Sequence, residues 1–323
     1  VTASLFLGSM RLYSLLAAAK INLYLEIIGS RPDGFHELVM VMQSVDLCDR
    51  ITVRSIGSDE IRLRCDHGDL PADQSNLAYR AASLMAAKFP EGMARLGGVE
   101  ITLEKRIPIG AGLAGGSADA AATLAGLNLL WGLGLTQGEL QIIGAELGSD
   151  VPFAISGGCA IATGRGELLD PLVSVDGLHV LLAKYRGLSV STPWAYQTYR
   201  QQFSHTYLQD EAGFESRRQQ VHSGDIVAAI SHHDGPNLAQ VLHNDLEKVV
   251  LPAHPQVAQL KQVMAAAGGL GTLMSGSGPT LFTLAASAAE AQALKETVRS
   301  QLPDPDLELW VARFAATGIR LED

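Results

Sequence analysis

The sequence contains little cysteine. Its 323 residues include only Cys48, Cys65 and Cys159, which lie far apart and form no C-x-x-C pair. Because the number is odd and the spacing wide, neither a disulfide framework nor a structural zinc site is expected. The nine histidines likewise form no H-E-x-x-H metal motif. A protein of a reducing compartment fits this pattern.

The sequence also lacks a basic surplus. Its 24 Lys and Arg residues stand against 34 Asp and Glu residues, which gives a formal net charge of −10. Proteins that bind nucleic acid normally carry a basic surplus, so no nucleic-acid partner is expected. A phosphate ligand would therefore need a local site built from backbone N–H groups and one or two cations.

Long hydrophobic runs are missing as well. Residues 14–28 are mostly apolar, but Lys20 and Glu26 interrupt them, and a membrane span needs roughly 20 apolar residues. No basic residue precedes the apolar residues 1–7, as it would in a secretory signal. We therefore expect a cytoplasmic protein with no membrane partner and no transit peptide, in which residues 1–9 form a short extension outside the fold.

Hydrophobic residues make up 47 % of the chain, enough for a large core. Strand and helix patterns mix without regular β-α-β alternation, which predicts an α+β fold in two domains, residues 1–170 and 171–323. Strands are predicted at residues 13–19, 21–28, 38–47, 50–56, 61–65, 99–107, 157–163, 178–184, 270–275, 280–284 and 307–314. Helices are predicted at residues 75–88, 118–130, 136–147, 225–231, 255–267 and 288–299.

Two regions between these elements carry weaker signals. The strands at residues 157–163 and 178–184 are expected to be joined by a glycine-rich turn. Residues 197–223 are polar and weakly patterned, which indicates loops or a mobile excursion. The helix at residues 136–147 has the clearest start, because Thr136 and Glu139 have the spacing of a capping box.

Glycine is what the chain has in excess, with 33 residues. Residues 108–117 read Pro-Ile-Gly-Ala-Gly-Leu-Ala-Gly-Gly-Ser, between a predicted strand and a helix that is apolar almost all round. Glycines let backbone N–H groups turn toward a phosphate, and the helix adds free N–H groups and the positive end of its dipole. The predicted phosphate-binding residues are Pro108, Ile109, Gly110, Ala111, Gly112, Leu113, Ala114, Gly115, Gly116 and Ser117.

The Ser117 hydroxyl could contact the phosphate or a bound magnesium ion. Other interpretations of the loop stay open, the plainest being a glycine-rich turn without a ligand. The loop is no Walker motif, because it lacks a Gly-Lys-Ser/Thr ending. It does satisfy the dinucleotide pattern G-x-G-x-x-G, but no parallel βαβ unit surrounds it and no acidic residue ends a strand about 20 residues later.

Two further clusters carry charge in apolar surroundings. Lys20 and Asn22 alternate within an apolar strand and therefore point to the same face. Asp150 follows a predicted helix end. Each residue alone has an ordinary interpretation: Lys20 as a lysine at the edge of a sheet, and Asp150 as an aspartate between a helix and a turn. Next to a nucleotide, however, the aspartate could take a proton from an attacking hydroxyl while the ammonium stabilises the developing alkoxide.

The clusters follow one another in a known order. Lys20-Ile21-Asn22, residues 108–117, residues 148–152 (Gly-Ser-Asp-Val-Pro) and residues 273–280 (Leu-Met-Ser-Gly-Ser-Gly-Pro-Thr) resemble the ordered motifs of the GHMP kinases, a superfamily of ATP-dependent small-molecule kinases. The resemblance implies a first domain like the second domain of ribosomal protein S5 and a ferredoxin-like second domain. It also implies ATP, with Mg²⁺, across residues 108–117 in a syn-like geometry, and a small-molecule acceptor between the domains.

One branch of the superfamily fits best. Residues 19–25 (Ala-Lys-Ile-Asn-Leu-Tyr-Leu), 31–38 (Arg-Pro-Asp-Gly-Phe-His-Glu-Leu), 43–47 (Gln-Ser-Val-Asp-Leu) and 244–247 (Asn-Asp-Leu-Glu) resemble the branch that phosphorylates a cytidyl diphosphate methylerythritol in the non-mevalonate route to isoprenoids. The similarity runs from residue 12 to about residue 309.

The resemblance assigns roles to individual residues. Asp150 would be the catalytic base and Lys20 its partner. The residues implied to bind the acceptor are Asn22 and Thr192 for placement, His36 for the cytosine edge, Phe35 and Tyr196 for stacking, and Ser275, Gly276, Ser277 and Gly278 of the last motif. The sequence departs from the branch pattern at Ala18 and Ser191, where proline is usual, and at Phe35, which is often tyrosine.

Other functions remain as alternatives. A GHMP kinase with a homoserine or mevalonate acceptor would share the fold, but the Asp-Gly-Phe-His stretch at residues 33–36 argues against it. A non-catalytic binding module on the same fold would be expected to lose Lys20 or Asp150, and both are present. A dinucleotide oxidoreductase is a more distant alternative. The protein is expected to be a monomer or a homodimer.

Overall fold

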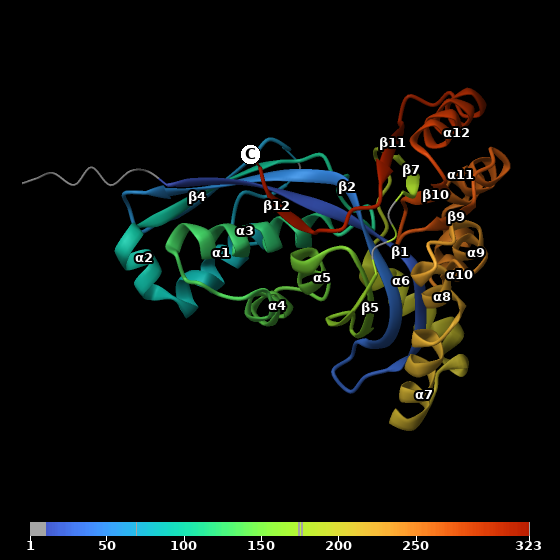
Figure 1. The fold of residues 1–323 in the computed structure, drawn as a ribbon, viewed down its shortest axis with the longest axis horizontal. Helices are drawn as coiled ribbons and strands as arrows, with labels where there is room; N and C mark the ends of the chain where they lie inside the picture. The colour runs from blue at the N-terminus through green and yellow to red at the C-terminus, as the bar shows by residue number, and fades with distance from the viewer. Residues whose placement is uncertain (1–10, 69, 174, 176, 323) are drawn as a thin grey trace, which may run out of the picture.

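The computed structural model describes residues 11–68, 70–173, 175 and 177–322, so the predicted extension at residues 1–9 lies outside the described residues. The described chain forms two sheets, and Figure 1 shows them as two lobes at an angle to each other. In the described residues the first sheet has eight strands and the second has four.

The first sheet is built on one long hairpin. Strands β1 (Leu12–Ser30) and β2 (His36–Ile56) pair antiparallel along nearly their whole length. The prediction of four shorter strands here was wrong, because β-bulges bend the hairpin without ending its ladder. Ala18 pairs with Cys48 whereas Ala19 pairs with Val45, so the register shifts close to the predicted breaks at residue 20 and at residues 48–49.

Six further strands complete this sheet. The path runs β12-β1-β2-β4-β3, while β5 pairs with β2 and β6, and β8 pairs with β1. Their bounds are β3 (Ile61–Cys65), β4 (Gly98–Glu104), β5 (Cys159–Gly164), β6 (Leu168–Leu172), β8 (His243–Asn244) and β12 (Ile319–Leu321). Strands β8 and β12 come from the second half of the chain. The domain division at residue 170 stays a prediction.

Helices cover one face of the first sheet (Figure 1). They are α1 (Leu77–Lys88), α2 (Pro90–Leu96), α3 (Gly115–Trp131), α4 (Gln137–Ala145) and α5 (Val151–Ser156). Helix α3 is buried on most sides, as its apolar sequence predicted, because it packs between the β1–β2 hairpin and α1. The capping box of Thr136 and Glu139 is present at the start of α4.

The second sheet has the order β11-β7-β10-β9 and is antiparallel throughout. Its strands are β7 (His179–Tyr185), β9 (Gly271–Met274), β10 (Leu281–Ala285) and β11 (Leu307–Arg313). With α11 (Pro255–Ala266) and α12 (Ala288–Gln301) against it, this is a βαββαβ, ferredoxin-like arrangement. Between β7 and α11 the chain also forms α8 (Asp225–Ser231), α9 (Gly235–Gln240) and α10 (Glu247–Ala253).

The hairpin predicted from residues 157–163 and 178–184 does not form. The glycine-rich turn after β5 leads instead to β6, which pairs with β5. Strand β7 then enters the other sheet and pairs with β10 and β11. A turn signal shows where a chain reverses, but only tertiary packing selects the partner strand.

Residues 197–223 are mostly helical, so the prediction of loops there was wrong. All but residues 207–210 and 223 belong to α6 (Thr192–Phe203), the 3-10 turn η1 (Ser204–Thr206) and α7 (Glu211–His222). Only Val221 of α7 is buried, so this helix has no apolar stripe for a pattern search to find. Besides the ring of Phe214, which packs against Gly29, ion pairs hold it against the hairpin: Arg217 Nε lies 2.9 Å from Glu26 Oε2, and Arg218 Nη2 lies 2.8 Å from Glu37 Oε1.

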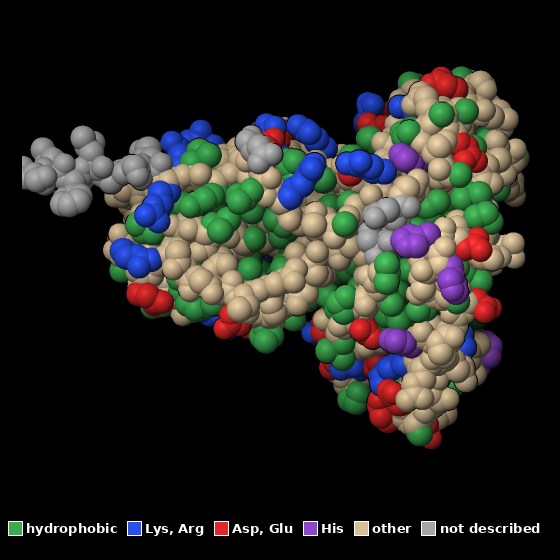
Figure 2. Space-filling model, in the orientation of Figure 1, with side chains coloured by type: hydrophobic (Ala, Val, Ile, Leu, Met, Phe, Trp, Pro, Cys, Tyr) green, Lys and Arg blue, Asp and Glu red, His purple; other side chains and the backbone are tan. Residues whose placement is uncertain are grey.

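Basic side chains gather along the upper edge of the first lobe in Figure 2. Several arginines of this sheet pair with acids, as Arg50 does with Glu104 at 3.3 Å and Arg64 with Glu100 at 3.1 Å. In the part of the chain that the structure describes, no helix combines the length and apolar composition that crossing a membrane requires.

Candidate active site

A cavity of about 890 Å³ lies where the two halves of the chain meet. Its walls come from β1, the turn after β1, the glycine-rich loop before α3, the start of α6 and the loop after β9. The predicted site residues line it, with four exceptions: Leu113, Ser117, Ser275 and Gly278. The structure therefore brings together residues that the sequence spreads over more than 250 positions.

The glycine-rich loop turns its backbone toward this cavity. Gly110 and Gly112 have φ angles of +59° and +73°, and Ala114 precedes α3 at +57°. A Cβ on Gly112 would lie 2.2 Å from the carbonyl oxygen of Ser275, so only glycine fits there. Gly115 and Gly116 open α3 and line the cavity. Their free N–H groups and the positive helix end suit an anionic phosphate.

Residues behind the lining hold this loop in place. The N–H of Lys20 donates to the Leu113 carbonyl at 3.1 Å. The Ser275 hydroxyl donates to the Gly112 carbonyl at 3.0 Å and accepts from the N–H of Asn22 at 3.3 Å. Leu113 and Ser275 thus join the loop to β1. The Ser117 hydroxyl lies outside the lining, so its predicted contact with magnesium has no support in the structure.

The last glycine-rich motif is itself positioned by Asn244. This buried side chain donates to the carbonyls of Met274 and Gly276 at 2.7 and 2.8 Å. A Cβ on Gly276 would lie 3.4 Å from Lys20 Nζ. The motif therefore packs directly against Lys20 in the middle of β1, and Asn244, part of the Asn-Asp-Leu-Glu segment, fixes its backbone.

Lys20 and Asp150 face each other in the cavity wall. Lys20 Nζ donates to Asn22 Oδ1 at 2.6 Å and lies 3.9 Å from Asp150 Oδ2. The lysine side chain is 8 % exposed and the aspartate 33 %. The predicted shared face of Lys20 and Asn22 is confirmed. A buried ammonium beside a solvent-reachable carboxylate can stabilise negative charge at one atom while a proton leaves another.

Aromatic side chains form another part of the cavity lining. The His36 ring lies 5.1 Å from that of Tyr196, and Phe35 is half exposed with the Arg165 guanidinium 5.0 Å from its ring centre. The Thr192 hydroxyl lies 2.8 Å from that of Ser277. His36 Nε2 is buried and has no hydrogen-bond partner among the described residues. Such an unsatisfied atom in a cavity wall fits a hydrogen bond to a ligand.

His36 is neutral at ordinary pH. Burial, and to a smaller extent the nearby positive charge of Arg200, together lower the pKa of its imidazole to about 4. The unfolded chain takes up a proton as the pH falls through about 6.5, whereas the folded protein resists protonation down to about pH 4. His36 therefore does not reduce the free energy of unfolding above pH 6.5. As the pH falls from 6.5 toward 4, the free energy of unfolding decreases progressively, because protonation of His36 favours the unfolded chain.

Replacing His36 by asparagine should reduce the pH dependence of stability. Between pH 7 and pH 4.5 we expect the free energy of unfolding of the unmodified protein to fall by about 2 kcal/mol more than that of His36→Asn. Urea unfolding at the two pH values measures this difference. Equal losses in both proteins would show that His36 titrates normally in the fold.

A buried charge cluster at the base of the loop was missed from the sequence. Lys105 Nζ donates to Asp119 Oδ2 at 2.6 Å and also to Asp49. Asp49 Oδ1 accepts from the N–H groups of Arg106 and Ile107 at 2.6 and 2.8 Å. Burial raises the pKa of the Asp119 carboxyl above its usual range. Asp119 was the available signal, because a carboxylate in an apolar helix needs a partner.

Further polar residues of the cavity lining were also missed, among them Asn76, Arg165 and Arg200. Arg200 comes from α6, in the segment that the sequence predicted as loops, so no pattern pointed to it. Among the described residues, no group of three or more His, Cys, Asp or Glu side chains is placed to hold a metal ion.

Comparison with known proteins agrees with this geometry. Residues 76–158 match the GHMP kinases N terminal domain, and residues 226–304 match the GHMP kinases C terminal family. Curated relatives from Gloeothece citriformis and Nostoc punctiforme, both named 4-diphosphocytidyl-2-C-methyl-D-erythritol kinase, are 58 % and 59 % identical over 313 residues. Each alignment covers 97 % of this chain and 99 % of the relative.

Solved structures give the same answer. The crystal structure of a 4-(cytidine 5'-diphospho)-2C-methyl-D-erythritol kinase superposes with a TM-score of 0.71 at 33 % identity, covering 94 % of this chain and 99 % of the other. A homoserine kinase from Cytophaga hutchinsonii superposes with a TM-score of 0.73 at 20 % identity, covering 99 % of this chain and all of the other, and shares the fold alone. This chain belongs to the 4-diphosphocytidyl-2-C-methyl-D-erythritol kinase family of the GHMP kinases.

Proposed function

We propose that this protein transfers the γ-phosphoryl group of ATP to the 2-hydroxyl of 4-diphosphocytidyl-2-C-methyl-D-erythritol, giving the 2-phosphate and ADP in the non-mevalonate route to isoprenoids. One observation carries the proposal. The aromatic wall of Phe35, His36 and Tyr196 lines the same cavity as Lys20, Asp150 and the glycine-rich loop. Residues suited to a base and residues suited to a phosphate thus line one cavity.

In the proposed reaction, the acceptor oxygen forms a bond to the γ-phosphorus while the bond to the β–γ bridging oxygen breaks. Asp150 accepts the proton of the attacking hydroxyl, and Lys20 stabilises the negative charge that develops there. The N–H groups at the loop and at the start of α3 hold the β- and γ-phosphates. Phosphoryl transfer needs mainly such positioning and charge stabilisation.

Magnesium enters this proposal with the nucleotide, as MgATP. Mg²⁺ keeps several waters and binds through few carboxylates together with substrate phosphates. A cytoplasmic location and the choice between monomer and homodimer stay predictions.

The acceptor is proposed to bind against the second half of the cavity. A neutral His36 has one ring nitrogen that donates and one that accepts, which suits the edge of a cytosine. Phe35 and Tyr196 offer ring faces for stacking. Asn22 accepts a hydrogen bond from Lys20, and the Thr192 hydroxyl bonds to that of Ser277 in the last motif. These two residues would place the hydroxyl to be phosphorylated.

The experiment is a coupled ADP-release assay with MgATP and each of four acceptors. We expect turnover with 4-diphosphocytidyl-2-C-methyl-D-erythritol and none above background with homoserine, mevalonate or galactose. Turnover with another acceptor only would keep the kinase chemistry and reject the cytosine site around His36. ATP binding without turnover of any acceptor would support a non-catalytic module instead.

A further inference from the structure

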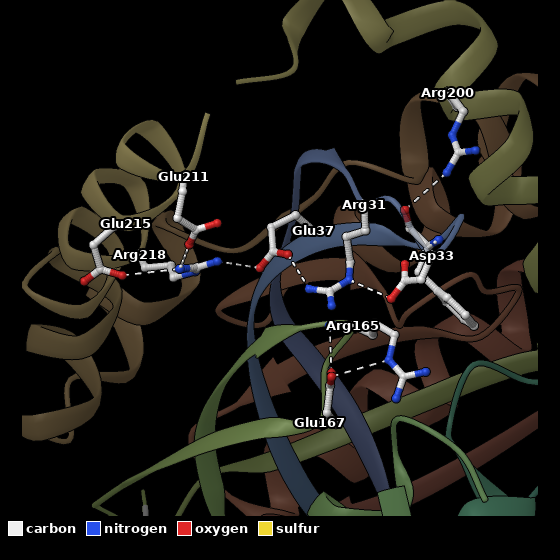
Figure 3. Close-up of polar contacts among 10 residues, drawn as sticks. Arg31, Asp33, Glu37, Arg165, Glu167, Arg200, Glu211, Glu215 and Arg218 are labelled. Atoms are coloured by element: carbon white, nitrogen blue, oxygen red, sulfur yellow. Dashed lines mark hydrogen bonds and ion pairs between the residues drawn. The ribbon is translucent and has the colours of Figure 1, made fainter. Parts of the chain in front are cut away.

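Arginines from two helices of the second half of the chain hold the turn that joins β1 to β2. This turn, residues 31–35, carries Phe35 and leads into His36. Arg200 of α6 donates to the carbonyl oxygens of Gly34 and Phe35 at 2.8 and 3.3 Å. Arg218 of α7 reaches the same region from the other side, through Glu37 (Figure 3).

Glu37 is the centre of this arrangement. Its side chain is 4 % exposed, and each carboxylate oxygen accepts from a different arginine. Oε1 accepts from Arg218 Nη2 at 2.8 Å, and Oε2 accepts from Arg31 Nη1 at 2.7 Å. A buried carboxylate is costly unless it is paired and hydrogen-bonded, so both contacts are needed to satisfy it.

From Arg31 the contacts continue to Phe35. Arg31 Nε donates to Asp33 Oδ2 at 3.2 Å, and Asp33 Oδ1 accepts from the N–H of Phe35 at 3.1 Å. The backbone N–H of Arg31 also donates to the Phe35 carbonyl at 3.0 Å. An unbroken series of polar contacts therefore runs from α7 to the residue that faces the cavity.

Arg218 is itself fixed by its own helix. Its Nη1 donates to Glu211 at 2.7 Å and to Glu215 at 3.3 Å, so three carboxylates surround one guanidinium (Figure 3). Arg218 lies outside the cavity lining. It cannot act on a ligand by contact, only through Glu37.

We infer that Arg218 is a positioning residue for the acceptor. Through Glu37 and Arg31 it fixes the turn 31–35, so that Phe35 and His36 are held in the shape that binds the nucleoside base. This inference rests on the proposed function. It makes α7, a polar helix far from the glycine-rich loop, a determinant of affinity for the cytidyl acceptor and not for ATP.

The neighbouring residue Arg217 supplies a matched control. It lies on the same helix and pairs with the same hairpin, through Glu26 at 2.9 Å and the Tyr24 hydroxyl at 3.1 Å. Those partners lie within β1, and none of them contacts the turn 31–35. Arg217→Gln therefore removes an ion pair of the same kind between α7 and the hairpin but leaves the series to Phe35 intact.

The test compares Arg218→Gln, Arg217→Gln and Glu37→Gln in the ADP-release assay, with the cytidyl acceptor and ATP varied separately. Arg218→Gln should raise the KM for the acceptor about tenfold and leave the KM for ATP and kcat within about twofold, since the loop and the Lys20–Asp150 pair are untouched. Glu37→Gln should also raise the KM for the acceptor about tenfold. The double variant Arg218→Gln/Glu37→Gln should show no larger KM than either single variant, because both changes break one series of contacts. Arg217→Gln should change neither KM.

A second readout does not depend on turnover. Hydrogen exchange of the backbone amides of residues 31–37 should be faster in Arg218→Gln than in the unmodified protein or in Arg217→Gln. If the unmodified protein does not phosphorylate the cytidyl acceptor, the proposed function fails, and the exchange rates alone decide the positioning role. Unchanged exchange in Arg218→Gln, or equal KM changes in the two arginine variants, would overturn the inference.

Discussion

Replacing Asp150 by asparagine is expected to lower kcat by about 10²- to 10⁴-fold, the usual contribution of a positioned general base. The amide keeps the shape of the side chain but cannot take the proton of the attacking hydroxyl. Asp150 makes no side-chain hydrogen bond to cap α5, so the substitution should not unfold that helix. Affinity for ATP should change little, because the loop N–H groups remain in place.

The measurement is kcat from initial rates with saturating MgATP and acceptor, together with a binding titration using a non-hydrolysable ATP analogue. Asp170→Asn is the matched control. Its side chain is 59 % exposed and pairs only with His222 among the described residues, so its kcat should stay unchanged. Near-normal turnover of Asp150→Asn would exclude this residue as the base.

Replacing Lys20 by methionine is expected to lower kcat by about 10²- to 10³-fold, the scale measured when one group that stabilises a developing anion is removed. Methionine has a similar length and suits the apolar strand, so the packing of β1 should survive. Asp150 would lose the cation 3.9 Å away, and Asn22 would lose its donor. Water cannot hold a positive charge in that position.

The double variant Lys20→Met/Asp150→Asn tests whether the two residues act as a unit. Groups that act on the same step are strongly non-additive, so the double variant should be about as slow as the slower single variant. Lys184→Met serves as a control for the loss of a buried lysine, because Lys184 is buried in the second sheet outside the cavity lining. A Lys20→Met enzyme with nearly full kcat would remove the ammonium from the mechanism.

Much of the site could be predicted from local sequence. The glycine-rich loop needs positive φ angles, which Gly110 and Gly112 adopt. The apolar sequence of α3 predicted that this helix is buried. Alternation within β1 was enough to place Lys20 and Asn22 on one face. These features depend on neighbours a few residues apart, which is the range over which backbone preference and side-chain periodicity act.

Other features depended on partners that no local pattern names. The polar sequence of α7 gave no helix signal because ion pairs with the hairpin and the single ring of Phe214, not an apolar stripe, hold it in place. The bulges of the long hairpin were read as strand ends, because a register shift and a turn disturb the alternation in the same way. The partners of Lys105 could not be identified from the sequence, because Asp49 and Asp119 come close to it only in the folded structure.

By itself, then, the sequence determined the chemistry of this protein: the glycine-rich loop, the lysine and aspartate, the Asp-Gly-Phe-His segment and their order along the chain. Only the tertiary structure decided how these parts meet. Ser275 joins Gly112 across 163 positions, and Arg218 joins Glu37 across 181. Such contacts form only when the two halves pack together, because a hydrogen bond or ion pair depends on distance in space and leaves no periodic trace in the chain.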